Sequence, residues 1–166
     1  MAIETERKFL VKSDDWRHDV QSSCRLVQGY AEVSGALSTL RVRIIDQTTA
    51  VLTLKGKSNG ISRSEYEYDI PLEDAAAMMN EFCGTRVVEK IRHTVPCGDL
   101  TWEVDEFINA NTGLLIAEIE LPTPETVFPQ PEWLGEEITG DSRYGNGYLS
   151  KTPFTQWQSK EIKDEL

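Results

Sequence analysis

Charged residues recur at every second position in several segments of this chain. Residues 2–11 carry Glu4, Glu6 and Lys8 in this arrangement, and side chains two positions apart share one face of a β-strand. Similar charged positions recur in residues 39–46, 50–57, 62–70, 86–95, 99–107 and 113–121. The pattern predicts seven strands with charge on one face and mostly apolar side chains on the other.

The charges on these strands are sorted by sign. An ordinary solvent-exposed sheet face explains any single strand, because opposite charges pair across strands. Over seven strands the acidic pairs would repel one another, which indicates a bound divalent cation such as Mg²⁺ or Mn²⁺. The basic positions indicate a phosphate-rich anion, and both together are the chemistry of phosphoryl transfer. The acidic pairs are Glu4/Glu6, Glu65/Glu67, Glu103/Asp105 and Glu118/Glu120, and the basic positions are Arg41/Arg43, Lys55 and Lys90/Arg92.

The order of the predicted elements favours one α+β domain built on an antiparallel sheet. Roughly eight short strands are expected, with a tight hairpin turn at Asn59-Gly60. A helix is predicted over residues 72–83, ended by Gly84, and the chain reads as interrupted helix from about Asp141. A sheet of this size tends to curl and close on itself.

Composition excludes several classes of protein. A net charge of −11 argues against binding to nucleic acid or to an anionic membrane surface. No apolar stretch is long enough to span a bilayer, and the charged N-terminus does not resemble an export signal. Cys24, Cys83 and Cys97 are odd in number and widely spaced, which fits reduced thiols in a cytoplasmic protein. His18 and His93 lack the spacing of a metal site.

Seven ordered elements of the sequence resemble the CYTH superfamily, the triphosphate tunnel metalloenzymes. Glu4-x-Glu6-x-Lys8 matches the ExExK signature of that superfamily. The resemblance runs from Ile3 to about Leu149 and predicts a CYTH domain over residues 1–150, followed by a helical tail over residues 151–166. The supporting elements are Arg41-x-Arg43, Leu54-Lys55, Arg63-Ser64-Glu65-Tyr66-Glu67, Glu89-Lys90-x-Arg92, Glu103-Val104-Asp105 and Glu118-Ile119-Glu120.

The resemblance implies an eight-stranded, antiparallel, closed β-barrel with a charged interior and helices packed outside. In this superfamily the basic residues of the tunnel bind a triphosphate and the acidic residues hold Mg²⁺ or Mn²⁺. The implied phosphate ligands are Lys8, Arg41, Arg43, Lys55, Lys90 and Arg92. The implied metal ligands, or residues supporting them, are Glu4, Glu6, Glu65, Glu67, Asp105, Glu118 and Glu120.

The resemblance also implies catalytic roles for a few of these residues. A carboxylate on the Glu118/Glu120 strand would orient the attacking water. Lys90 is implied as a further catalytic residue that also binds the substrate. Tyr30 is a candidate proton acceptor, although packing of a strand aromatic against a helix explains this residue equally well.

The short chain resembles the bacterial members that act on inorganic triphosphate, because it lacks an appended helical CHAD-type domain. The prediction is a cytoplasmic, metal-dependent hydrolase that splits triphosphate into pyrophosphate and phosphate. Two alternatives stay open within the superfamily: an adenylate cyclase of the fourth class, and a thiamine or nucleoside triphosphatase. A non-catalytic polyphosphate-binding module is a third alternative. Homodimerisation and closure of one tunnel mouth by the C-terminal segment are also open.

Overall fold

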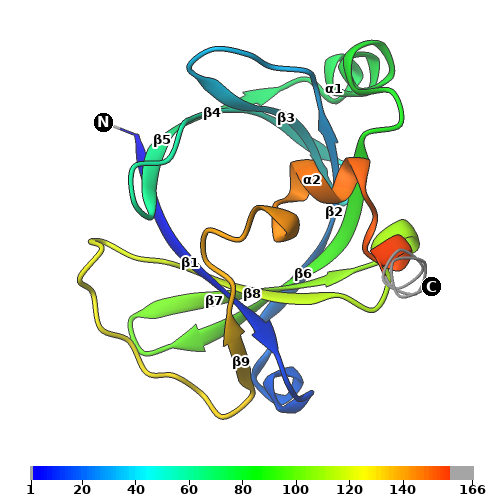
Figure 1. The fold of residues 1–166 in the computed structure, drawn as a ribbon. Helices are drawn as coiled ribbons and strands as arrows, with labels where there is room; N and C mark the ends of the chain where they lie inside the picture. The colour runs from blue at the N-terminus through cyan, green and yellow to red at the C-terminus, as the bar shows by residue number, and fades with distance from the viewer. Residues whose placement is uncertain (1, 158–166) are drawn as a thin grey trace, which may run out of the picture.

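The computed structural model describes residues 2–157, whose strands close into a ring (Figure 1). The strands follow the order β5-β4-β3-β2-β6-β7-β8-β1, and pairing of β5 with β1 closes the barrel. Every pairing is antiparallel, so the predicted eight-stranded, antiparallel, closed barrel is confirmed. The strands are β1 (Ile3–Val11), β2 (Ser22–Tyr30), β3 (Leu37–Ile45), β4 (Thr49–Gly56), β5 (Ser62–Ile70), β6 (Val87–Cys97), β7 (Leu100–Phe107) and β8 (Leu115–Glu120).

A ninth strand, β9 (Leu134–Glu137), pairs with the end of β1 beside the ring. The predicted helix over residues 72–83 is helical throughout, but it changes type along its length. It begins as α1 (Leu72–Met78), continues as a π-helical turn, η2 (Met79–Cys83), and ends at Gly84, whose φ of 59° suits glycine. The remaining helical elements are η1 (Asp15–Asp19), η3 (Asn109–Asn111), η4 (Ser142–Tyr144), α2 (Asn146–Lys151) and η5 (Phe154–Gln156). None of the helices in residues 2–157 is long and apolar enough to cross a membrane.

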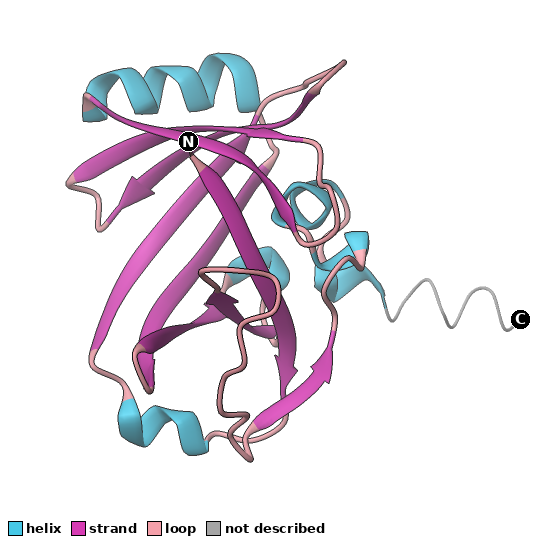
Figure 2. Cartoon of the chain, turned by 90° about the vertical axis from the view of Figure 1, so that its left-hand side faces the viewer, coloured by secondary structure: helices cyan, strands magenta, loops and turns pink. Residues whose placement is uncertain are grey.

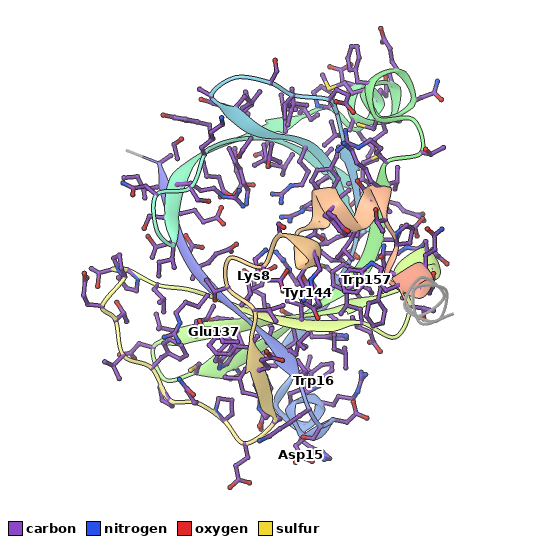
Figure 3. The ribbon with its side chains drawn as sticks, viewed as in Figure 1. Lys8, Asp15, Trp16, Glu137, Tyr144 and Trp157 are labelled. Atoms are coloured by element: carbon purple, nitrogen blue, oxygen red, sulfur yellow. The ribbon has the colours of Figure 1, made fainter. Side chains whose placement is uncertain are left out.

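Helices cover only part of the outer surface of the barrel. The helix α1 lies outside the ring (Figures 1 and 2) and packs Ala75 against Val42 and Ala50 of β3 and β4. The largest outer cluster is rich in aromatic residues and includes side chains of η1, β9 and the 121–133 loop. Trp16 of η1 lies below the ring in the view of Figure 3. The cluster includes Phe9, Trp16, Trp102, Phe128 and Trp133.

The inner face of the barrel is charged along most of its length and apolar at one end. Val88, Phe107 and Ile116 each lie two residues from a charged inner residue, and they pack in one cluster with Tyr30 and with Leu149 of α2. We call this cluster the apolar floor. It is built by α2 and by the inner side chains of the strands, so the C-terminal segment fills part of the barrel beside β2 and β6 (Figure 1).

The predicted C-terminal tail is described only in part. Lys151 is the last residue of α2, and η5 follows it. Trp157 packs edge-on against Phe154 and Tyr144, which holds this segment against the barrel (Figure 3). The rest of the tail lies outside the described residues. The boundary between domain and tail at residue 150 stays a prediction.

Candidate active site

The inner face of the barrel encloses a cavity of about 700 Å³. Among the residues predicted from sequence, only Asp105 is missing from its lining; Asp105 is fully buried behind Lys90 and Arg92. The predicted residues that line the cavity are Glu4, Glu6, Lys8, Tyr30, Arg41, Arg43, Lys55, Glu65, Glu67, Lys90, Arg92, Glu118 and Glu120.

Two arginines on β3 lack full compensation by acidic groups. Arg43 donates from Nε to Gln28 Oε1 at 2.8 Å and forms no ion pair among residues 2–157. Burial, together with Arg41 and Arg92 nearby, lowers the pKa of Arg43 to about 10. The Nε atom of Arg41 is buried and has no hydrogen-bond partner in the part of the chain that the structure describes. Donors left unsatisfied in this way favour an anion that can accept several hydrogen bonds.

A buried network joins β6, β7 and α2 beside these arginines. Arg92 makes two hydrogen bonds to Asp105, at 2.8 and 2.9 Å. Lys90 Nζ donates to Asp105 Oδ2 at 2.6 Å and to Asn146 Oδ1 at 3.1 Å. Burial lowers the pKa of Lys90 to about 8, although Asp105 opposes that shift. The pKa of Lys90 therefore lies closer to neutrality than that of an ordinary lysine.

Glu118 lies between cations from two other strands. Lys8 Nζ is 3.5 Å from Glu118 Oε1, and Arg92 is 3.5 Å from Glu118 Oε2. Burial alone would raise the pKa of Glu118, but Lys8, Arg92 and Lys90 bring it well below its usual range. Glu118 is therefore a carboxylate that stays ionised at any pH near neutrality.

The remaining acids repel one another. Burial and the neighbouring Glu118 raise the pKa of Glu6 to about 7. The pKa of Glu120 is raised by burial and by Glu4, Glu65, Glu103 and Glu6. Glu4 is 5% exposed, and its Oε1 atom is buried with no hydrogen-bond partner among the described residues. Carboxylate oxygens are the ligands that Mg²⁺ and Mn²⁺ prefer, so these acids fit a divalent cation.

The acidic residues are not yet arranged around a common point. Within residues 2–157, no group of three or more His, Cys, Asp or Glu side chains is placed to hold a metal ion. Lysines hold the carboxylates apart: Lys55 contacts Glu4 and Glu65, and Lys8 lies 3.6 Å from Glu6. A metal ion would therefore have to replace ammonium groups at these acids.

Several residues of the site were missing from the sequence prediction. Arg63 and Glu103 line the cavity; both lie on predicted charged faces, and Glu103 belongs to a predicted acidic pair, but neither was among the implied ligands. Gln28 and Thr53 are fully buried and orient Arg43 and Arg41. They carry no charge, so the alternation of charged residues did not identify them. Asn146 comes from a helix start distant in the chain and is placed only by the fold.

Comparison with known proteins agrees with this geometry. The sequence profile of the CYTH domain matches residues 2–153. The chain belongs to the CYTH family. The inorganic triphosphatase of Acetivibrio thermocellus is a CYTH relative 42% identical over 158 residues, covering 95% of this chain and 99% of the relative. The inorganic triphosphatase of Nitrosomonas europaea is 33% identical over 153 residues, covering 89% and 96%.

A solved CYTH structure supports the same assignment. The crystal structure of the inorganic triphosphatase NE1496 aligns with a TM-score of 0.64 at 31% identity, covering 90% of this chain and 95% of that one. The superfamily predicted from the ExExK signature is thus confirmed for this chain. The individual roles of the site residues are untested by these comparisons and stay predictions.

The raised pKa of Glu6 predicts how the stability of this CYTH barrel depends on pH. A carboxyl whose pKa is 4.5 unfolded and about 7 folded stabilises the fold below pH 4.5, and this contribution is lost as pH rises through 7. The loss is on the order of 3 kcal/mol. With a chelator present, Glu6→Gln is therefore expected to unfold at higher denaturant than the wild type at pH 8, and at similar denaturant at pH 4.5. Urea titrations of both proteins at both pH values measure the difference between their unfolding midpoints. An equal difference at pH 8 and pH 4.5 would contradict the prediction.

Proposed function

We propose that this protein hydrolyses inorganic triphosphate to pyrophosphate and phosphate, using Mg²⁺ or Mn²⁺. The observation that carries the proposal is the coexistence, in one cavity, of incompletely compensated arginines and carboxylates. Among residues 2–157, Arg43 has no ion pair and Arg41 Nε has no hydrogen-bond partner, although Arg41 lies 4.0 Å from Glu67. On the acidic side, Glu4 Oε1 has no donor among these residues, although Glu4 Oε2 pairs with Lys55, and Glu120 lies among other acids. A polyphosphate anion bound with a divalent cation would satisfy both sets at once. Relatives named inorganic triphosphatases favour the same substrate.

In this proposal the basic residues bind the phosphoryl oxygens of the substrate. Lys8, Arg41, Arg43, Lys55, Lys90 and Arg92 fill that role. The cation would be held by carboxylates chosen from Glu4, Glu6, Glu65, Glu67, Asp105, Glu118 and Glu120. Bound there, it would neutralise the acids and stabilise charge on the phosphoryl and attacking oxygens. The ion pairs of Asp105 favour a supporting role, in which it orients Lys90 and Arg92.

The chain's own residues supply the proton transfer and the positioning. Glu118, held ionised by Lys8 and Arg92, would orient a water molecule toward a terminal phosphorus. The water oxygen forms a bond to that phosphorus as the bridging P–O bond breaks, and the protons of the water stay on the new phosphate, which releases any excess to solvent. Lys90 Nζ is placed to give a proton to the departing pyrophosphate oxygen, and its lowered pKa of about 8 suits that role. Tyr30 lines the same cavity, and its hydroxyl accepts a hydrogen bond from Gln28 at 2.8 Å.

A substrate panel tests this function. Purified protein is incubated with triphosphate, ATP or thiamine triphosphate, each with Mg²⁺, Mn²⁺ or a chelator, and the products are identified. Fast release of phosphate and pyrophosphate from triphosphate, abolished by the chelator, is expected. Faster turnover of an organic triphosphate would reject the substrate, and cyclic AMP with pyrophosphate would indicate a cyclase. Binding without turnover under any condition would indicate a phosphate-binding module. In the same proposal the enzyme acts in the cytoplasm, with no nucleic-acid or membrane partner. Its mass in solution decides between a monomer and a homodimer.

A further inference from the structure

Lys55 occupies the position of a cation between two carboxylates. Its Nζ atom lies 2.8 Å from Glu4 Oε2 and 2.9 Å from Glu65 Oε2. The three residues come from β4, β1 and β5, where pairing of β1 with β5 closes the barrel. Lys55 is 7% exposed, so the ammonium is largely removed from bulk water. A buried carboxylate, Glu4, and a partly buried one, Glu65, so close to one site need a positive charge between them.

The ammonium satisfies this pair of carboxylates incompletely. Glu4 Oε1 is buried and has no hydrogen-bond partner within residues 2–157, although Glu4 Oε2 accepts a hydrogen bond from Lys55. A free carboxylate oxygen of this kind, on a residue lining the cavity, is suited to a metal ion. A divalent cation and the Lys55 ammonium cannot both bind between Glu4 and Glu65, because like charges at that separation repel strongly.

Lys55 also has a second possible partner. It lines the cavity that holds Arg41 and Arg43, and a lysine stem is flexible enough to move its ammonium to an entering phosphoryl oxygen. Such a movement would leave Glu4 and Glu65 without their cation at the moment when the substrate arrives.

We propose that Lys55 is an exchangeable cation that keeps a metal ion out of the Glu4–Glu65 pair until an oxyanion draws the ammonium away. Metal and anion then bind cooperatively, since each favours the same position of Lys55. The identity of the anion as triphosphate rests on the proposed function. The competition between Lys55 and a divalent cation is independent of that function.

Direct measurement of Mn²⁺ binding, with no triphosphate present, tests the inference. Free Mn²⁺ is followed by electron paramagnetic resonance during titration of wild type, Lys55→Gln and Lys57→Gln. Lys57 is exposed two residues further along the same hairpin, so its substitution matches the change in net charge. Lys55→Gln is expected to bind Mn²⁺ about tenfold more tightly than wild type, a typical size for coupling between sites. Lys57→Gln should bind like wild type. Equal affinities of Lys55→Gln and wild type would overturn the proposal.

Sulfate gives a second test that does not depend on folding of the Lys55 variant. This tetrahedral dianion is expected to tighten Mn²⁺ binding several-fold in wild type and in Lys57→Gln, compared with chloride at equal ionic strength. Lys55→Gln, if circular dichroism shows that it folds, should not respond to sulfate. No effect of sulfate on the wild type would overturn the proposal. Neither test measures hydrolysis, so failure to split triphosphate would reject only the proposed function.

Discussion

Replacement of Glu118 by glutamine is expected to slow triphosphate hydrolysis by about a hundred- to a thousandfold, the usual effect of removing one electrostatic group from a catalytic site. Lys8 and Arg92 hold Glu118 ionised, and glutamine keeps its size but loses the charge that orients water. The fold should persist, because Lys8 retains Glu6 and Arg92 retains Asp105 and Glu103. Steady-state kcat and KM for triphosphate, measured by phosphate release, give the result.

Two glutamate variants serve as comparisons for Glu118→Gln. Glu89 lies on β6 and pairs with Arg25, so Glu89→Gln makes the same change on the opposite strand face and should leave kcat unchanged. Glu120→Gln removes an acid that other carboxylates crowd; it should mainly raise the metal concentration needed for half-maximal rate. A Glu118→Gln enzyme with kcat within threefold of wild type would reject the role given to this carboxylate.

Replacement of Lys90 by methionine is expected to cut kcat by about a hundred- to ten-thousandfold, the range for loss of a positioned proton donor. The side chain is 1% exposed and donates to Asp105 and Asn146. Methionine fills similar space without a proton. The barrel should still fold, because Arg92 keeps both hydrogen bonds to Asp105. Kinetics with triphosphate measure the effect, and Lys57→Met is the control.

The pKa of Lys90 gives an independent readout of its environment. Its folded pKa of about 8 lies below the unfolded value of 10.5, so the unfolded chain binds more protons between these values and stability rises with pH across this window. The wild type should therefore gain free energy of unfolding relative to Lys90→Met from pH 8 to 10. Parallel curves would show that Lys90 is not perturbed by burial, whatever its role in catalysis.

The alternation of charge along single strands predicted the strands and most of the side chains that line the cavity, whereas the closed barrel and the roles of these residues were implied by the family resemblance. Side chains two apart share a strand face, so Glu4, Glu6 and Lys8 had to point the same way once residues 2–11 were taken as a strand. The carboxylates of each acidic pair would repel one another if no cation were bound, and this repulsion indicated a divalent cation. Arg63 and Glu103 follow from the same rule and could have joined the predicted set.

The sequence by itself therefore determined the strands, the orientation of their charged faces and the family, since these depend on local periodicity and on short ordered motifs. Only the tertiary structure decided which charges remain unpaired. Lys55 meets Glu4 because β1 and β5 close the barrel, and Lys90 meets Asn146 because α2 packs on the apolar floor. These partners lie 51 and 56 residues apart, and their meeting depends on strand register and closure, which no local pattern encodes.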